Sequence, residues 1–331
     1  MAKEKKRKTK AYYSGIGGQA VLEGIMMKNK DKYAVAVRKP DDEIEVDIDE
    51  YSGVLKGHVA KEIPFLRGVF NFIDSLVLGM KTINYSASFY EDDVTTETKF
   101  EKLLNKVFRG KADKVISAVV TVFSVALAIG IFIILPYFLT GLLTKNVRND
   151  TLTNLIEGLI RIIIFVLYVL LISLSKDIKR VYMYHGAEHK CINCIEHGHP
   201  LTVNNVMKSS RLHRRCGTSF LLLVILVSIV LFFFIHVDSR ALRLVIRVLL
   251  IPVIAGISYE ILRLAGRTSG LLIKIISAPG LLLQKITTRE PDEKMVEVAI
   301  SAVEAVFDWK DFLKEKFNWE EEETSQEVKE P

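Results

Sequence analysis

The chain has 331 residues, half of them hydrophobic, and a formal net charge of +6 at pH 7. This length allows two modest domains, or one domain together with a membrane region. The apolar residues are concentrated in long runs, which favours the second arrangement. Three cysteines are too few for a disulfide framework, so the chain is not a small disulfide-stapled secreted protein.

Residues 1–11 are rich in Lys and Arg, and no apolar core follows them, which argues against a signal peptide and predicts a disordered basic tail. Residues 12–62 are predicted to form a β-rich cytoplasmic domain. Within it, residues 33–38 and 43–48 have the composition of strands, and the second of these alternates apolar with acidic side chains. Glu23 interrupts another apolar strand. Its carboxylate is either a polar partner in a site or an edge residue that faces water.

Residues 63–110 are predicted to hold an amphipathic helix and a polar linker. Between residues 65 and 86, apolar side chains recur every three to four positions around a narrow polar stripe. A helix that is so widely apolar and yet broken by charges is expected to lie in the membrane interface or to pack on membrane spans.

Residues 111–266 are predicted to form four transmembrane helices. The first two apolar runs fit the ~20 residues that a span needs, and the third is near the short limit. The fourth has to snorkel its arginines, or else is a buried helix. The runs cover residues 116–135, 155–174, 219–235 and 242–264. The predicted fold class is therefore an α-helical membrane protein with about four transmembrane helices and a small β-containing (α+β) cytoplasmic N-terminal domain.

The connection between the second and third runs, residues 176–218, is rich in Lys and Arg. The positive-inside rule places this connection and both termini in the cytoplasm. The prediction is a multi-pass protein of the cytoplasmic (inner) membrane, with the lipid bilayer as its partner. Residues 267–290 are predicted to be interfacial or re-entrant, residues 291–318 an amphipathic helix, and residues 319–331 an acidic disordered tail.

The same connection holds five of the seven histidines and all three cysteines. His185 and His189 are four residues apart, so on a helix their side chains share one face, and Glu188 leans toward it. This H-x-x-E-H spacing is the inverted zincin arrangement. It predicts a divalent metal site, with zinc expected and manganese or iron as alternatives, in which Glu188 accepts a proton from metal-bound water. Three candidates remain open for the third ligand: His213, Cys216 and Glu260.

Two other interpretations compete for these residues. Cys191 and Cys194, followed at a distance by His213 and Cys216, have the spacing of a closed structural zinc site. Against this, Cys191 falls two residues after His189 on the same helix, and the glycines usual between such cysteines are missing. A nucleophilic Cys216 thiol beside His213 is a further alternative, although no third orienting group is evident.

Several short motifs between residues 15 and 297 are specific when taken together. They are GGQAVLEGIMM at 17–27, RG at 67–68, GM at 79–80, HGAEHK at 185–190, LTV at 201–203, RCGTSF at 215–220, AGISYE at 255–260, and PG at 279–280 through TTREP at 287–291. In these motifs the sequence resembles the YqhQ-like family of bacterial multi-pass membrane proteins, which are of unknown function and are described as predicted metal-dependent enzymes.

The resemblance implies a location in the cytoplasmic membrane and a metal site. The residues it implies for that site are His185, Glu188, His189, His213 and Cys216. It does not include Cys191, which weakens the closed zinc site, and it names no substrate.

The expected function is a metal-dependent hydrolase acting at the cytoplasmic face of the membrane on a peptide or a lipid-linked group. The alternative is a non-enzymatic membrane scaffold or assembly factor whose metal only holds the loop, so the assignment as an enzyme stays open. Transport has little support, because the spans hold few polar residues apart from Arg161, Arg247 and Glu260. No specific nucleic-acid partner is expected, and homo-oligomerisation is left open.

Overall fold

The computed structural model describes residues 11–56, 58–59, 62–90, 112–146, 149–235, 237, 239–267 and 270–320. The predicted basic tail, the polar linker that follows the amphipathic helix, and the acidic C-terminal tail lie almost entirely outside the described residues.

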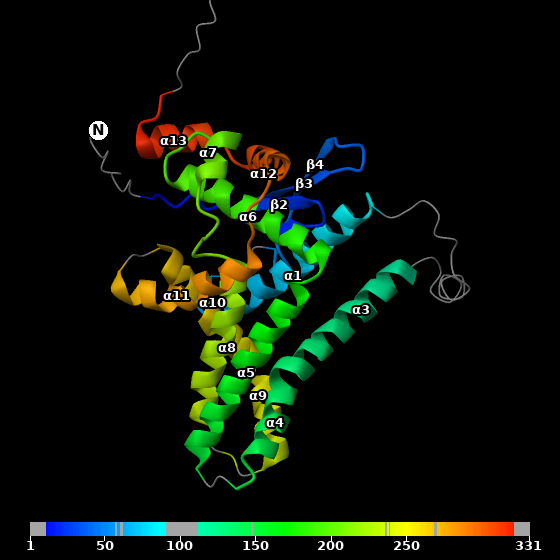
Figure 1. The fold of residues 1–331 in the computed structure, drawn as a ribbon, viewed down its shortest axis with the longest axis vertical. Coiled ribbons are helices and arrows are strands. Elements are labelled where there is room, and N and C mark those ends of the chain that lie inside the picture. The colour runs from blue at the N-terminus through cyan, green and yellow to red at the C-terminus, as the bar shows by residue number, and fades with distance from the viewer. Residues whose placement is uncertain are drawn as a thin grey trace, which may run out of the picture.

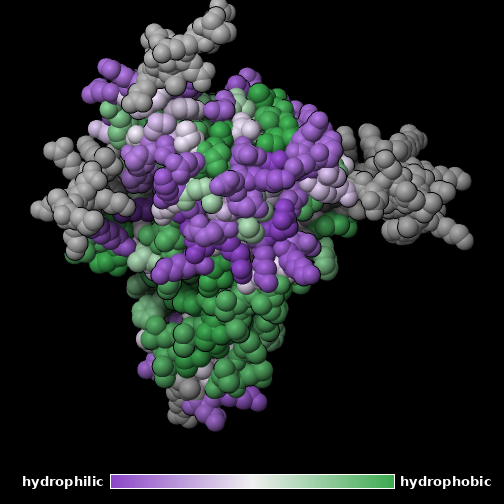
Figure 2. All heavy atoms as spheres, turned by 45° about the horizontal axis from the view of Figure 1, so that its top comes forward, coloured by the Kyte–Doolittle hydropathy of each residue, from purple (hydrophilic) through white to green (hydrophobic). Residues whose placement is uncertain are grey.

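The described chain forms a head, which contains the sheet, on a stem of helices (Figure 1). Hydrophobic residues cover the stem, whereas hydrophilic residues dominate the head (Figure 2). The protein is mostly helical and has one small antiparallel sheet near its N-terminus. This confirms the predicted combination of a helical protein with a small β-containing N-terminal part.

The sheet is an antiparallel meander of four strands in the order β1-β2-β3-β4. Its strands are β1 (Gly17–Val21), β2 (Gly24–Asn29), β3 (Lys32–Arg38) and β4 (Ile44–Glu50). The two strands expected at residues 33–38 and 43–48 coincide with β3 and β4. The sequence suggested that Glu23 lies inside a strand, and this prediction was wrong. Glu23 lies in the two-residue turn between β1 and β2, where its φ of 47° closes the hairpin.

Alternate residues of the central strands supply the two faces of the sheet. Ile25 and Ala34 belong to the main core of the head, which α6 (Lys176–Glu196) and α12 (Glu293–Val306) complete. Val35 and Val37 face the other way, toward Leu78 of α1 (Leu66–Ala87). Two shorter helices, α7 (Val203–Lys208) and α13 (Trp309–Phe317), close the head around α6 and α12. The sheet therefore holds α6 on one face and α1 on the other.

The stem consists of α3 (Ala112–Ile129), the π-helix η2 (Gly130–Ile134), α4 (Leu135–Leu143), α5 (Asp150–Ile172), α8 (Gly217–Phe233), α9 (Arg240–Leu249) and α10 (Ile251–Arg267). By length and composition, two described helical stretches could cross a membrane: Ala118–Leu143 and Thr151–Ile172. The pair α9 and α10 would be a third if it is one span, but it is bent by 42°. These helices indicate membrane association.

The described residues thus offer two or three candidate spans of full length, against the four predicted. The third predicted span corresponds to α8, which is apolar but has 17 residues. This helix begins directly after its N-cap residue, Cys216, and ends at Phe233. The fourth is divided near Leu250 into two helices.

Three charged side chains from the apolar runs are buried together inside the stem. Glu157 Oε1 lies 2.8 Å from Nη2 of Arg161 and 2.7 Å from Nη1 of Arg247. Arg161 also donates to Ser228 Oγ at 2.7 Å. The side chains of Arg161 and Arg247 are each 3% exposed. The arginines of this run were expected to snorkel toward the membrane surface. Arg247 does not, because it is paired with Glu157 inside the stem.

Helix α11 (Leu271–Thr287) lies within the segment 267–290, which was predicted to be interfacial or re-entrant. The helix continues through Pro279, and Gly280 allows it to lie directly against α8. A Cβ at Gly280 would come within 2.5 Å of Ser219 Oγ. The C-terminal end of α11 thereby reaches the base of α6, where the candidate site lies.

Candidate metal centre

The two histidines of the H-x-x-E-H motif lie on α6, one turn apart on the same face. Their ring centroids are 4.4 Å apart. Cys216, at the start of α8, brings its thiol to the same point, so that one ligating atom from each of the three residues lies within 4.8 Å of the others. Among the described residues, His185, His189 and Cys216 are the one such group that could hold a metal ion.

Both imidazoles are anchored through Nδ1 to backbone carbonyls. His185 Nδ1 lies 2.9 Å from the carbonyl oxygen of Thr287, and His189 Nδ1 lies 2.7 Å from that of Arg211. Because a carbonyl oxygen can only accept, each Nδ1 carries the proton, and in the neutral ring Nε2 keeps its lone pair. This outer contact orients metal-binding histidines in proteins generally. In the neutral form of each ring it leaves Nε2 as the possible ligand atom.

The Cys216 thiol occupies the N-cap of α8, where its Sγ accepts from the backbone N–H of Thr218 at 3.4 Å. His185 Nε2 lies 3.0 Å from the same sulfur. Burial raises the pKa of Cys216, but the neighbouring His185 and His189 outweigh it and hold the pKa well below its ordinary value. Conversely, burial lowers the pKa of His185, but the thiolate outweighs it and raises the pKa to about 9. The site therefore favours a thiolate, the form of cysteine that binds metals.

Glu188 is buried beside this group, against the β1 strand. The backbone N–H of Gly18 hydrogen-bonds its carboxylate, and a Cβ at Gly18 would lie 3.1 Å from Glu188 Cδ. Burial raises the pKa of Glu188, although His189 and His185 oppose the shift. A carboxyl group with a raised pKa next to a candidate metal site is suited to accept a proton and then release it.

His213 lies beside the site but outside the ligand group. Its ring centroid is 5.6 Å from that of His189, while its Nε2 faces Glu196 Oε2 at 3.5 Å. The side-chain amide of Gln284 holds the His213 backbone on both sides: His213 N donates to Oε1 at 2.8 Å, and Nε2 donates to the His213 carbonyl at 2.7 Å. Gln284 thus fixes the segment that leads into Cys216.

Glu260 is placed away from the three ligand atoms. It lies on α10 and forms a two-pronged ion pair with Arg67 of α1, in which Arg67 Nε donates to Oε1 at 2.6 Å. Arg263 Nη1 lies 4.0 Å from Glu260 Oε2. Of the three candidates for the third ligand, the structure brings only Cys216 to His185 and His189.

The alternative interpretation, a closed zinc site of Cys191, Cys194, His213 and Cys216, is not assembled among the described residues. Cys191 and Cys194 are both buried in the apolar core of the head. Cys194 Sγ faces the backbone carbonyls of His199 and Pro200 at 3.6 and 3.5 Å. Burial raises the pKa of both thiols, the opposite of what a ligand needs. This interpretation fails because both thiols belong to the face of α6 that packs into the core.

Glu196 is the last residue of α6, and its carboxylate contacts both the N-terminal segment and the segment before α8. It accepts from the backbone N–H and hydroxyl of Ser14 at 2.9 and 2.7 Å and pairs with Arg215. Burial raises its pKa, but hydrogen bonding to His213 and the charge of Arg215 prevail and lower it to about 2.

This carboxylate should make stability depend on pH in acid. Its pKa is lower in the folded protein than the ordinary 4.5, so its contribution is fully present above pH 4.5 and is lost as the pH falls toward 2. A shift of this size corresponds to about 3 kcal/mol. We expect thermal unfolding of the wild type, followed in detergent, to lose stability over this window more steeply than that of Glu196→Gln. Equal pH slopes for the two proteins would contradict the assignment.

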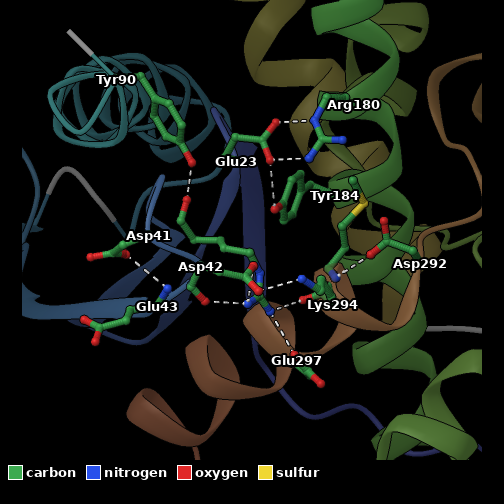
Figure 3. A network of polar contacts seen from close by, with 12 residues as sticks. Glu23, Asp41, Asp42, Glu43, Tyr90, Arg180, Tyr184, Asp292, Lys294 and Glu297 are labelled. Atoms are coloured by element: carbon green, nitrogen blue, oxygen red, sulfur yellow. Dashed lines mark hydrogen bonds and ion pairs between the residues drawn. The ribbon is translucent and has the colours of Figure 1, made fainter. Parts of the chain in front are cut away.

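A polar clamp fixes α6 on the β1–β2 hairpin (Figure 3). The Arg180 guanidinium binds both carboxylate oxygens of Glu23, and the Tyr184 hydroxyl donates to Glu23 Oε2 at 3.3 Å. Because Arg180 lies just over one helical turn before His185, the clamp sets the position of the motif relative to Gly18. Glu23 therefore supports α6 and is not itself a ligand.

The sequence analysis gave no role in the site to three residues that help to form it: Gly18, Gly186 and Gln284. Gly186, inside the motif, lets α6 touch the chain after α11, because a Cβ there would overlap the carbonyl oxygen of Arg289. Gly18 and Gln284 contact Glu188 and His213 as described above. Of these three residues, only Gly186 carried a local signal in the sequence. Glycine is unfavourable inside a helix, so its presence in the motif indicates that another part of the chain comes close to α6 there.

Comparisons with known proteins agree on one family. Residues 63–309 match the family described as "Protein of unknown function (DUF1385)". The chain is 38% identical over 287 residues to the "Uncharacterized protein YqhQ" of Bacillus subtilis (strain 168). The matched region covers 86% of this chain and 90% of that protein. No solved structure matches the chain.

Proposed function

Since the chain belongs to the DUF1385 family, whose description names no activity, we propose its function from the geometry of the site: a membrane-associated, metal-dependent hydrolase. His185, His189 and Cys216 would hold a divalent cation, and Glu188 would accept the proton. The observation that carries this proposal is the convergence of one ligating atom each from His185, His189 and Cys216, with both Nδ1 atoms held by backbone carbonyls.

Two imidazoles and one thiolate form a donor set that suits zinc, with a fourth position open for water or substrate. Iron is the next candidate, and manganese fits least because it prefers oxygen donors. When bound, such a cation would acidify a water molecule and polarise a carbonyl or phosphoryl oxygen. Glu188, held by the Gly18 amide, would take up the proton and pass it to the leaving group.

We further propose that the site lies at the cytoplasmic face of a four-span protein, with both termini in the cytoplasm. The positively charged connection around α6 supports this orientation. At 1.5 Å per residue, the 17 residues of α8 are about 25 Å long, enough for a slightly thin bilayer core, and α9 with α10 would form one bent span. The substrate would then be a peptide or a lipid-linked group near the inner leaflet.

A nucleophilic thiol is a second candidate, favoured by the distance of 3.0 Å between Cys216 Sγ and His185 Nε2 at a helix N-terminus. It gives no role to His189, whose ring is anchored in the same way. The two candidates differ in their need for a metal ion, which can be measured directly.

The proposed site should bind one cobalt ion per chain and show a thiolate-to-cobalt charge-transfer band. Cys216→Ser should abolish the band and weaken binding by more than the 10–100-fold typical of outer-shell changes. Cys194→Ser is the matched control, because this thiol is buried in the core of the head and should leave the band unchanged. An unchanged band in Cys216→Ser, or no stoichiometric binding by the wild type, would contradict the metal site.

Glu188→Gln separates a catalytic metal from a structural one. Loss of a general base lowers rates by about 10²–10⁴-fold. We expect the zinc-loaded variant to keep its metal and its melting temperature but to hydrolyse the generic ester p-nitrophenyl acetate at least about 10²-fold more slowly. Wild-type rates in this variant would favour the scaffold alternative, in which the metal only holds the loop.

A further inference from the structure

The sulfur of Cys216 has a neighbour that is not one of the candidate ligands. Thr218, the second residue of α8, brings its hydroxyl oxygen Oγ1 to 3.0 Å from Cys216 Sγ, and its backbone N–H donates to the same sulfur at 3.4 Å. The N–H contact belongs to the helix N-cap, so almost any residue at position 218 would provide it. The hydroxyl contact requires the side chain that the sequence places there.

The direction of this hydroxyl contact follows from the charge of the sulfur. A cysteine that binds a cation is a thiolate, which carries no proton and can only accept. The Thr218 hydroxyl must then donate. Its own oxygen can accept from the Thr287 hydroxyl, which lies 3.4 Å away and has the Leu283 carbonyl as its other acceptor at 3.4 Å. Thr287 also supplies the carbonyl that holds His185 Nδ1, so the end of α11 contacts the outer partners of two candidate ligands.

The Thr218 hydroxyl does not make the contact that is usual for a threonine in a helix. Such hydroxyls often donate to a carbonyl of the preceding turn. Thr153, near the start of α5, does so with the Asn149 carbonyl at 3.1 Å. Among the described residues no backbone carbonyl accepts from the Thr218 hydroxyl, whose two contacts are the Cys216 sulfur and the Thr287 hydroxyl. The sulfur is therefore the acceptor that the fold offers to it.

We propose that Thr218 is a positioning residue of the candidate metal centre, whose hydroxyl donates to the Cys216 thiolate. This inference rests on the proposed metal site. Outer groups that hydrogen-bond to ligands orient them and tune the metal. A thiolate that shares its charge with a donor gives less of it to the cation, which remains a stronger Lewis acid. The same hydrogen bond makes the sulfur a weaker nucleophile, so it favours hydrolysis over attack by Cys216 itself.

The cobalt-loaded, full-length protein in detergent tests this role, because the energy of the thiolate-to-cobalt band reports the charge on the sulfur. Thr218→Val keeps the branched shape and removes the hydroxyl. We expect the band to move to lower energy and the cobalt affinity to fall about 10-fold. Thr218→Ser keeps a donor and should show the wild-type band and affinity. A merely structural role would lower the melting temperature of Thr218→Val without moving the band.

Thr153→Val is the matched control. It removes the hydroxyl of another half-buried threonine near a helix start, one that bonds to the backbone only, and should leave the band unchanged. Thr218→Ala also removes the hydroxyl and adds no strain, so it keeps the test decisive if Thr218→Val does not fold. A band at the wild-type energy in either folded variant of Thr218 that lacks the hydroxyl would overturn the proposal.

The same spectra separate this proposal from the metal centre on which it rests. If the wild type shows no charge-transfer band, both fail. If the wild-type band is lost in Cys216→Ser but does not move in Thr218→Val, the metal centre stands and the role of Thr218 alone fails.

Discussion

Glu157→Gln is expected to destabilise the protein by about 3–5 kcal/mol. Glu157 is the one carboxylate in contact with both Arg161 and Arg247 among the described residues, and the side chains of all three are at most 6% exposed. The Arg161 Nε and Arg247 Nη1 atoms already lack a well-aligned hydrogen-bond acceptor. The glutamine amide can still accept a hydrogen bond, but no negative charge then offsets the two guanidinium groups in the apolar stem, whose other contacts include Ser228 and the rings of Phe232 and Tyr137.

Thermal unfolding in detergent, followed by circular dichroism, measures this effect. Asp49→Asn is the control, because it breaks the Lys81–Asp49 pair at 2.7 Å, whose side chains are 55% and 49% exposed. Water and salt screen such an exposed pair, so its loss should change stability little. If Glu157→Gln changed stability no more than Asp49→Asn does, the charges would not be buried together as described.

Gly186→Ala is also expected to destabilise the protein strongly. The direction of this change is informative, because alanine usually stabilises a helix relative to glycine. Inside a helix, alanine is normally about 1 kcal/mol better than glycine. Here the added Cβ would overlap the carbonyl oxygen of Arg289, whose own N–H donates to Tyr182 O at 2.8 Å. We expect a net loss of about 3 kcal/mol, at the upper end of ordinary overpacking costs. We also expect a 10–100-fold lower metal affinity, because the shift carries the Thr287 carbonyl away from His185.

Gly217→Ala is the matched control. Gly217 is also a helical glycine beside the site, but no atom lies within 4 Å of the place of its Cβ. This variant should keep both the melting temperature and cobalt binding. An equal or higher melting temperature for Gly186→Ala would show that α6 does not approach Arg289 as closely as described.

The features that sequence could predict were those with a local cause. Helical periodicity places His185 and His189 on one face whatever the rest of the chain does. Composition predicts β3, alternation predicts β4, and long apolar runs predict the stem. These signals depend on residues a few positions apart, so they do not require the fold to be known.

The remaining features depend on distant contacts. Cys216 and Glu260 were equal candidates by composition, and only the docking of α8 and α11 on α6 separates them. Arg247 was expected to snorkel, because nothing nearby in the chain shows that Glu157 lies on a facing helix. The continuation of α11 through Pro279 could not be predicted either, because it goes with the packing of Gly280 on Ser219 of α8. Glu23 looked like a strand residue because the two-residue turn that contains it has no glycine within the turn.

X-ray absorption spectroscopy at the zinc edge of the zinc-loaded protein tests the central claim most directly. The account expects a first shell of one sulfur at about 2.3 Å and two imidazole nitrogens with one further oxygen or nitrogen at about 2.0–2.1 Å. Cys216→Ser should remove the sulfur contribution. A shell without sulfur in the wild type, or one with two or more sulfurs, would contradict a centre formed by His185, His189 and Cys216.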